Sequence, residues 1–183
     1  MHKAVFMDRD GTVSEEVGYM YHAGLYRPYA WTGPAIRKIN HSGMKAILVT
    51  NQSGVERGYF AESTVHEVHE VLRRELERNH AHLDAVYYCP HLPETGCSCR
   101  KPNPGMLLQA QQAFDLDLAR SFVIGDRRID LELAHAVGAT GVLVMTGDGR
   151  NELALCKNGG VQPDMVADNL MAAVEAILET EHA

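Results

Sequence analysis

The stretch that decides the fold is KAVFMDRDGT, residues 3–12 of the chain. Its first five residues are almost entirely apolar, and aspartates follow at positions 8 and 10, just before Gly11. A short apolar run that stops at acidic residues is typical of a strand buried on both faces of a parallel sheet. Ligands bind beyond the carboxyl ends of such strands, so Asp8 and Asp10 are candidates for a functional site.

The rest of the chain alternates apolar runs with amphipathic stretches. We predict further strands at residues 46–49, 85–88, 121–124, 141–145 and 165–167, and helices at 34–43, 62–80, 104–114, 131–137 and 169–180. Gly43 is expected to end the first helix, and Ser63, Thr64 and Asp168 are candidate N-terminal caps. This alternation predicts an α/β protein with a doubly wound, mainly parallel sheet and helices on both faces.

The composition limits the classes of protein that this chain can represent. With 183 residues it is long enough for one self-supporting core without disulfides. Its 24 acidic and 17 basic residues give a formal charge of −7, which argues against a nucleic-acid partner. No apolar run approaches the roughly 18 residues that a membrane helix needs, and the N-terminal run is too short for a signal peptide. We therefore expect one cytoplasmic, monomeric domain over residues 1–183, with no nucleic-acid or membrane partner.

Polar residues that could act in catalysis or metal binding follow three of the predicted strands. They are residues 8–12, residues 50–53 (TNQS) and residues 125–130 (GDRRID). Carboxylates gathered at one sheet edge repel each other unless a cation lies between them, and Mg²⁺ suits such oxygen ligands. Two aspartates on one strand face can have different roles in phosphoryl transfer: one attacks phosphorus and the other acts as acid and base. Residues 8–11 alone would fit a polar turn equally well, but the other two strand ends favour the site.

A second cluster combines three cysteines with a histidine: Cys89, His91, Cys97 and Cys99. Four nitrogen and sulfur ligands complete a tetrahedral zinc shell, and such closed shells are structural. The alternative is a set of reduced surface thiols beside a chance histidine, because a disulfide is disfavoured in a reducing cytoplasm. Arg100 and Lys101 follow directly, so zinc would anchor a loop, residues 89–104, that directs both side chains at substrate.

Taken together, these motifs resemble the haloacid dehalogenase (HAD) phosphohydrolases. The family's first motif, Asp-x-Asp-x-Thr, matches residues 8–12, and its last, Gly-Asp-x-x-x-Asp, matches residues 125–130. Thr50 matches the second motif and Lys101 the third, in the same order along the chain. The resemblance implies a Rossmann-like HAD fold with a zinc-binding loop and without a large cap domain.

The resemblance also implies roles for these residues. Asp8 would be the nucleophile that forms an aspartyl-phosphate, and Asp10 would protonate the leaving alkoxide and then activate water. Thr50 and Lys101 would hold the phosphoryl oxygens. The residues implied for Mg²⁺ are Asp8, the main-chain carbonyl of Asp10, and Asp126, with Asp130 acting through water or from behind the ligands.

The cysteine cluster narrows the resemblance. The runs C-P-H and C-x-C-R-K-P, with residues 50–60 and 104–106, look like the D-glycero-D-manno-heptose-1,7-bisphosphate 7-phosphatase family of lipopolysaccharide and S-layer sugar synthesis. Histidinol-phosphatase domains are its nearest relatives, and the five residues between His91 and Cys97 are as few as in those domains. The resemblance implies a substrate loop at residues 13–33. The substrate-binding residues it implies are Glu16, Gly18, Tyr19, Asn51, Gln52, Ser53 and Arg100.

The expected function is therefore a Mg²⁺-dependent phosphomonoesterase that works through an aspartyl-phosphate on a small phosphorylated sugar, foremost heptose 1,7-bisphosphate at its 7-position. One alternative is hydrolysis of histidinol phosphate or another small phosphosugar. An alternative of another class is a non-catalytic, zinc-stabilised phospholigand-binding protein. The intact pair Asp8 and Asp10 speaks against the latter, because a decayed enzyme would be expected to lose it.

Some features fall outside these motifs. His66 and His69 are three residues apart on a predicted helix, and we expect both to be solvated. Residues 147–150 follow a predicted strand, where contact with a ligand is one interpretation and a turn the favoured one. Cys156 is expected to pack as a small hydrophobic residue.

Overall fold

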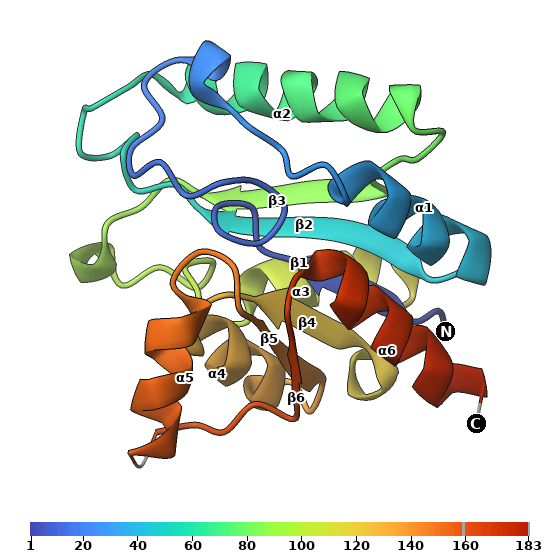
Figure 1. Cartoon of the computed structure of the whole chain (residues 1–183). Helices are drawn as coiled ribbons and strands as arrows, with labels where there is room; N and C mark the ends of the chain where they lie inside the picture. The colour runs from blue at the N-terminus through green and yellow to red at the C-terminus, as the bar shows by residue number, and fades with distance from the viewer. Residues whose placement is uncertain (159, 183) are drawn as a thin grey trace.

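The computed structural model describes residues 1–158 and 160–182. Over these residues the six strands of one sheet are β1 (Ala4–Met7), β2 (Lys45–Asn51), β3 (Ala85–Cys89), β4 (Phe122–Gly125), β5 (Thr140–Val144) and β6 (Met165–Ala167). They lie in the order β3-β2-β1-β4-β5-β6, and every neighbouring pair is parallel (Figure 1). The predicted parallel sheet is confirmed, and the strand order reverses at β1.

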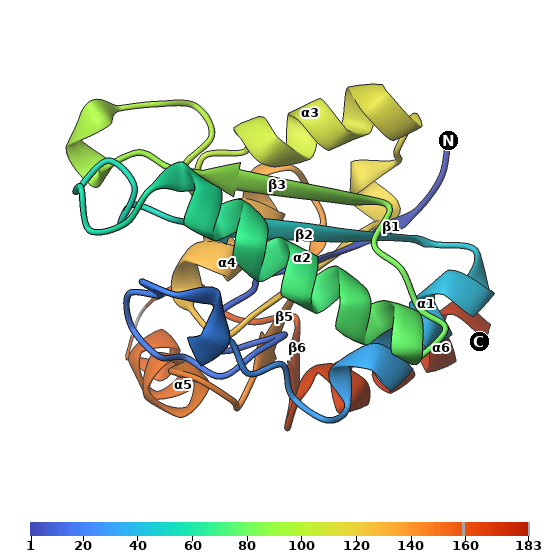
Figure 2. The same ribbon diagram turned by 90° about the horizontal axis from the view of Figure 1, so that it is seen from above.

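Helices cover both faces of this sheet, as predicted. One face carries α1 (Thr32–Ser42), α2 (Glu62–Arg78) and α6 (Leu170–His182). The other face carries α3 (Gly105–Phe114), α4 (Arg128–Ala136) and α5 (Gly149–Lys157). Figure 2 shows α2 and α3 on opposite sides of the strands. Among the described residues, no helix is both long and apolar enough to span a bilayer.

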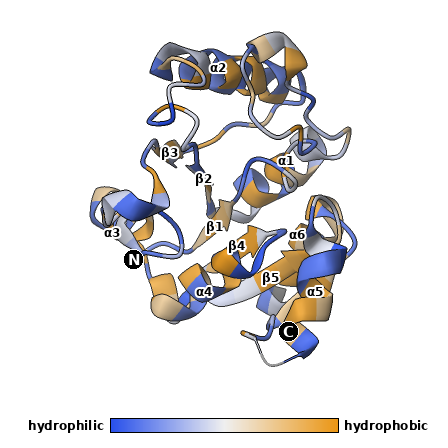
Figure 3. Cartoon of the chain, turned by 90° about the vertical axis from the view of Figure 1, so that its left-hand side faces the viewer, coloured by the Kyte–Doolittle hydropathy of each residue, from blue (hydrophilic) through white to orange (hydrophobic). Residues whose placement is uncertain are grey.

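The central strand β1 joins the two cores. Val5 and Met7 pack into the core beneath α1, α2 and α6, whereas Ala4 and Phe6 pack into the core beneath α3 and α4. This alternation follows from the two-residue period of a strand, and it explains why β1 reads as a continuous apolar run. Figure 3 shows the hydrophobic colour along β1, β4 and β5. A buried β1 with fixed register sets the position of the aspartate that follows it.

Two predicted helix caps differ from the structure. Gly43 does end α1, in the left-handed conformation with φ 81°. Ser63 and Thr64 do not cap α2, because the helix already begins at Glu62 and both lie within its first turn. Asp168 does not cap α6; the Oδ1 of the next residue, Asn169, accepts the N–H of Ala172 at 3.1 Å.

The predicted turn at residues 147–150 continues into helix α5, which the sequence analysis missed. Its glycines lower the helix propensity of the first turn, so the local sequence favours a bend. Burial overrides that preference, because Cys156 packs with Leu131 and Leu143 in a small core of its own. Cys156 is fully buried, as expected for a residue that packs as a small hydrophobe.

Candidate active site

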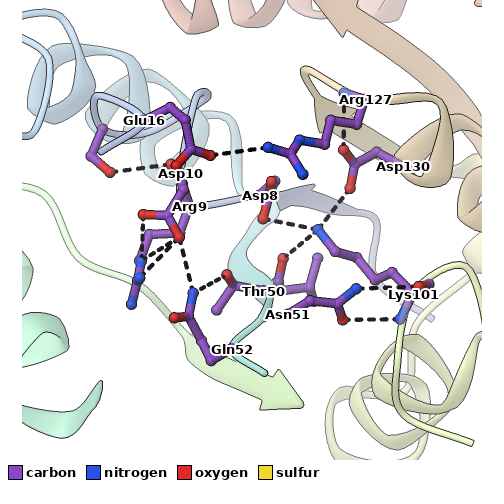
Figure 4. Close-up of polar contacts among 12 residues, drawn as sticks. Asp8, Arg9, Asp10, Glu16, Thr50, Asn51, Gln52, Lys101, Arg127 and Asp130 are labelled. Atoms are coloured by element: carbon purple, nitrogen blue, oxygen red, sulfur yellow. Dashed lines mark hydrogen bonds and ion pairs between the residues drawn. The ribbon is translucent and has the colours of Figure 1, made fainter. Parts of the chain in front are cut away.

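The site lies at the carboxyl edge of the sheet, where the strand order reverses between β1 and β4. Asp8 follows β1, Thr50 lies near the end of β2 and Asp126 follows β4. Lys101 comes from the loop that precedes α3. Ligands of parallel sheets bind at such a reversal. Here Asp8, Thr50 and Lys101 line a cavity of about 350 Å³, and Figure 4 shows their side chains converging.

The same cavity is lined by every substrate residue that the resemblance implied: Glu16, Gly18, Tyr19, Asn51, Gln52, Ser53 and Arg100. Asp10 lines it too. Arg57 and Arg127 also line it, although neither was among the predicted site residues. Arg57 is the first residue of the run RGYF. Its positive charge, seven residues after Thr50 at the end of a strand, was the feature that could have indicated a site residue.

Lys101 holds the centre of the site. Its Nζ lies 2.9 Å from Asp8 Oδ1 and 2.7 Å from Asp130 Oδ1, and it also donates to the carbonyl oxygen of Val49 at 3.1 Å. Burial by itself would lower the pKa of this ammonium, but the carboxylates of Asp130 and Asp8 outweigh burial and raise it. Lys101 is therefore a buried cation next to the predicted nucleophile.

Asp10 lies beside this pair and is held from two directions. Gln52 Nε2 donates to Asp10 Oδ2 and to Thr50 Oγ1, both at 2.9 Å, so one amide links the first and second motifs. On the other side, Arg9 Nη2 lies 2.9 Å from Asp10 Oδ2. The Nη1 atom of Arg9 lies 3.4 Å from Nε2 of His69, which comes from α2. The expectation that His69 is solvated is therefore wrong.

Three carboxylates can hold a metal ion. Asp8, Asp126 and Asp130 each offer an oxygen within 4.8 Å of the others. The Oδ2 of Asp126 accepts the N–H of Asp148 at 2.8 Å, whereas its Oδ1 is buried without a hydrogen-bond partner among the described residues. Burial, and then repulsion by Asp8, raise the pKa of Asp126 to about 8. An orphaned oxygen among like charges fits a divalent cation, and hard carboxylate oxygens suit Mg²⁺.

Asp130 differs from the other two carboxylates. Its Oδ1 pairs with Lys101, and its Oδ2 accepts the N–H of Arg127 at 3.3 Å at the start of α4. Burial, offset in part by Lys101, raises the pKa of Asp130 to about 6. Both oxygens are therefore already engaged; the expected role of Asp130 behind the metal ligands stays a prediction.

Two glycines enclose the Asp126 carboxylate. Gly11 has φ 84° and Gly147 has φ 54°, a region that glycine adopts readily. A Cβ atom at either position would lie 2.2 Å or 2.1 Å, respectively, from Asp126 Oδ2. The loop at Gly147 is thus part of the site wall, and its next residue, Asp148, pairs with Arg127 at 2.9 Å. From sequence, a turn is the favoured prediction for residues 147–150, and contact with a ligand the less favoured one.

The loop that contains Glu16 and Tyr19 is held across the cavity by an ion pair and an aromatic contact. Arg127 Nη2 lies 3.2 Å from Glu16 Oε2, and Glu16 Oε1 accepts the N–H of Gly18 at 2.7 Å. Burial raises the pKa of Glu16. The ring of Tyr19 meets the ring of Tyr59 edge to face, with centroids 4.6 Å apart. Residues far apart in sequence therefore form one rim.

The Cys/His cluster brings four candidate zinc ligands together. The three Sγ atoms lie 3.0 to 3.5 Å apart, and the Nδ1 of His91 lies 3.5 Å from Cys89 Sγ and 3.3 Å from Cys99 Sγ. A tetrahedral zinc ion with bonds of about 2.3 Å separates its sulfur ligands by about 3.8 Å. All four thiols of the chain are free, so the cluster is not a disulfide. The ligand set Cys89, His91, Cys97 and Cys99 could hold zinc.

The cluster is tied to the catalytic edge through the main chain. The N–H of Gln52 donates to the carbonyl of Cys89 at 2.7 Å, and Arg100 Nη1 donates to the carbonyl of His91 at 3.0 Å. Lys101 then enters the site two residues after the last cysteine. The loop at residues 89–104 thus connects the Cys/His cluster to the buried cation, and its anchoring by zinc stays a prediction.

Comparison with known proteins agrees with this arrangement. The model of the HAD-hydrolase-like family matches residues 98–173. The D-glycero-D-manno-heptose-1,7-bisphosphate 7-phosphatase of Thermosynechococcus vestitus is 41% identical, covering 95% of this chain and 94% of that protein. The corresponding enzyme of Haemophilus ducreyi is 37% identical, covering 94% and 96%. The crystal structure of the Bordetella bronchiseptica phosphatase, complexed with magnesium and phosphate, superposes with a TM-score of 0.90 at 34% identity, covering 97% and 99%.

Proposed function

The chain belongs to the D-glycero-D-manno-heptose-1,7-bisphosphate 7-phosphatase family of HAD-like hydrolases, and from this premise we propose that it hydrolyses the 7-phosphate ester of heptose 1,7-bisphosphate. The observation that carries the chemistry is the contact between Lys101 Nζ and Asp8 Oδ1 at 2.9 Å, beside the orphaned Asp126 oxygen. A buried cation there offsets the negative charge that develops on the phosphoryl oxygens.

The reaction has two steps. In the first, a carboxylate oxygen of Asp8 attacks phosphorus, the bond from phosphorus to the sugar oxygen breaks, and Asp10 gives its proton to the leaving alkoxide. In the second, water attacks the aspartyl-phosphate, Asp10 takes a proton from it, and the bond from phosphorus to Asp8 breaks. Inorganic phosphate leaves and both aspartates return to their starting state.

The remaining residues hold the phosphoryl group and the metals. Thr50 Oγ1 and Lys101 Nζ donate to the phosphoryl oxygens. The residues that would hold Mg²⁺ are Asp8, Asp126 and the main-chain carbonyl of Asp10. When bound, Mg²⁺ supplies positive charge that offsets repulsion between the nucleophile and the anionic substrate. Zinc at the cysteine cluster would have only a structural role, because four protein ligands leave it no open position.

The rim residues select the sugar. Arg57 and Arg100 both line the cavity, so a bisphosphate offers them a second anionic group that a monophosphate lacks. Tyr19, Glu16 and residues 51–53 complete the contacts with the sugar. A charged rim of this kind lets a chain with a formal charge of −7 accept an anionic substrate.

Other properties follow from the same proposal. Residues 1–183 form one phosphatase domain, in which residues 13–33 are the substrate loop and residues 89–104 the zinc loop. The enzyme is cytoplasmic, where the zinc thiolates stay reduced. The proposal assigns every step to residues of one chain and takes the enzyme to be a monomer. Light scattering on the purified protein tests the last point, and a dimer at micromolar concentration would contradict it.

The substrate is tested by measuring kcat/KM for heptose 1,7-bisphosphate and histidinol phosphate side by side on the same preparation. We expect the heptose bisphosphate to be preferred, with phosphate released from its 7-position. A higher kcat/KM for histidinol phosphate would overturn the choice of substrate but not the chemistry. That second candidate is favoured by one observation, the short spacing of five residues between His91 and Cys97.

A further inference from the structure

Arg9 is the most deeply buried charged side chain that the mechanism leaves unused. It lies between the nucleophile and the acid/base in sequence, and it is 1% exposed. On a regular strand its side chain would point away from both neighbours. The strand ends at Met7, however, and the carbonyl of Arg9 accepts the N–H groups of Val13 and Ser14 in the tight turn that follows. The side chain of Arg9 therefore folds back onto the carboxylate of the next residue, Asp10.

The guanidinium of Arg9 is directed at a single carboxylate. Its Nε lies 3.0 Å from Asp10 Oδ1 and 3.2 Å from Oδ2, and its Nη2 lies 2.9 Å from Oδ2. Among the described residues, Asp10 is its only ion-pair partner. Gln52 donates to the same Oδ2 from the opposite side. Three nitrogen atoms hold the carboxylate in one orientation, and a fixed orientation favours proton exchange with a group placed beside it.

His69 and Tyr26 hold Arg9 from behind. The Nε2 of His69 lies 3.4 Å from Arg9 Nη1, and the guanidinium carbon lies 6.0 Å from the centre of the Tyr26 ring. Because Arg9 can only donate, His69 must accept with a neutral ring. Burial, and then the charge of Arg9, lower the pKa of His69 to about 3, so the ring stays neutral at working pH. The imidazole of His69 thus accepts a hydrogen bond from Arg9 Nη1, a buried donor that would otherwise be unpaired.

We propose that Arg9, held by His69, is a positioning residue that fixes the Asp10 carboxylate for proton exchange with the leaving group. The proposal rests on the role given to Asp10 in the proposed function. It makes α2, which contributes no residue to the cavity lining, part of the support for the acid. A buried arginine that served only to stabilise the turn would affect all substrates alike, whereas a positioning role depends on whether the leaving group needs a proton.

The test uses this dependence on the leaving group. Heptose 1,7-bisphosphate releases an alkoxide that must be protonated, whereas p-nitrophenyl phosphate releases a phenolate that leaves without a proton. kcat/KM covers the steps up to formation of the aspartyl-phosphate, so it excludes the later role of Asp10 as a base. For Arg9→Lys, which keeps the charge and loses the fork, we expect kcat/KM to fall about 10- to 100-fold on the sugar and less than about threefold on the aryl ester.

Variants of His69 give a second, independent test, because they leave Arg9 unchanged. His69→Leu removes the acceptor and should lower the sugar-to-aryl ratio of kcat/KM by about three- to tenfold, since one hydrogen bond is lost. His69→Gln keeps an acceptor and should restore most of the ratio. His66→Gln is the matched control: His66 lies on the same helix, contacts Tyr88 rather than Arg9, and should leave the ratio unchanged.

Equal losses on both esters, or no loss in either the Arg9 or the His69 variants, would overturn the proposal. If Arg9→Lys does not fold, the pair His69→Leu and His69→Gln decides alone. A wild-type enzyme that ignores the heptose bisphosphate but hydrolyses histidinol phosphate would refute only the proposed substrate, and the same ratio is then measured with that alkyl ester. A wild-type enzyme that hydrolyses no alkyl ester would overturn both proposals.

Discussion

The side chain of Asn51 is hydrogen-bonded to both main-chain polar groups of Lys101: its Oδ1 accepts the N–H at 3.0 Å, and its Nδ2 donates to the carbonyl at 3.2 Å. Asn51 is the last residue of β2, and Lys101 lies at the end of the zinc loop. Because β2 is part of the sheet, the two hydrogen bonds from Asn51 fix the position of the Lys101 main chain, and so of its ammonium group, relative to β2. The same side chain lines the cavity, so Asn51 places the lysine beside the proposed substrate site.

Asn51→Ala should therefore impair catalysis through Lys101. Two hydrogen bonds, each worth about 0.5–1.5 kcal/mol, hold the backbone, so we expect kcat/KM to fall by about 5- to 100-fold. Asn51→Asp keeps the acceptor for the N–H but loses the donor, and it should lie between the wild type and Asn51→Ala. Steady-state kinetics on one substrate checks the order of the three proteins. An Asn51→Ala variant with wild-type kinetics would show that the contact with β2 does not determine the position of Lys101.

Gly147→Ala should disrupt the magnesium site without affecting the zinc site. The new Cβ would lie 2.1 Å from Asp126 Oδ2 and 2.6 Å from the Cα of Gly11, so the carboxylate must move. Gly138→Ala is the control, because Gly138 also has positive φ, 74°, but has open space around its Cβ position. Both variants carry backbone strain of about 1–2 kcal/mol. Only Gly147→Ala should lose Mg²⁺-dependent activity, and equal activity in the two variants would count against the proposed packing.

Stabilisation by Mg²⁺ should increase with pH. The metal-free folded state holds a proton on Asp126 up to about pH 8, whereas the unfolded chain releases it near the ordinary value of 3.8. The folded state therefore binds more protons across that window, so the metal-free protein loses stability as the pH rises through it. Mg²⁺ displaces this proton, and its affinity should rise between pH 6 and pH 8 by up to about tenfold per unit.

Thermal melts with and without Mg²⁺ at pH 6 and pH 8 measure this linkage. The increase in Tm on adding Mg²⁺ should be larger at pH 8. Asp126→Asn carries no proton to displace, so it should abolish the difference between the two pH values. A shift in Tm that is independent of pH in the wild type would place the metal elsewhere.

Cys97→Ser should lower zinc content and activity together. We expect one equivalent of zinc in the wild type by elemental analysis and less than one in the variant, since serine is a poor zinc ligand. Loss of the ion frees the loop that carries Lys101, so kcat should fall while Asp8 and Asp10 are unchanged. Cys156→Ala is the matched control, because it removes a buried thiol outside the cluster. A metal-free protein with full activity would contradict the role given to zinc.

Patterns local in sequence predicted the features that local rules determine. The buried run of β1 and the acids that end it placed Asp8 at the sheet edge, and the spacing of Cys97 and Cys99 indicated a metal cluster. The structure confirms the strand and brings the cysteines together, because strand period and burial act over a few residues, whereas zinc binding stays a prediction. The same rules predicted Gly43 at the end of α1, where a left-handed residue is needed.

Contacts between distant segments could not be read in this way. Arg9 turns back to Asp10 only because the chain bends after β1, and its other neighbour, His69, is sixty residues away. The helical period did place His69 beside the apolar stripe of α2, four residues after Val65 and three before Leu72, but it did not indicate Arg9 as its partner. Helix α5 was missed for a related reason, since burial of Cys156 against β5 outweighs the glycines at the helix start.

Rapid acid quench of the enzyme with substrate carrying a labelled phosphoryl group tests the central claim, covalent catalysis by Asp8, most directly. The wild type and Asp10→Asn are mixed with labelled p-nitrophenyl phosphate, digested and mapped by mass spectrometry. The account predicts one phosphoryl group on the peptide that contains Asp8, more abundant in Asp10→Asn because the second step lacks its base. An active enzyme that shows no phosphoryl group on that peptide in either protein would contradict the account.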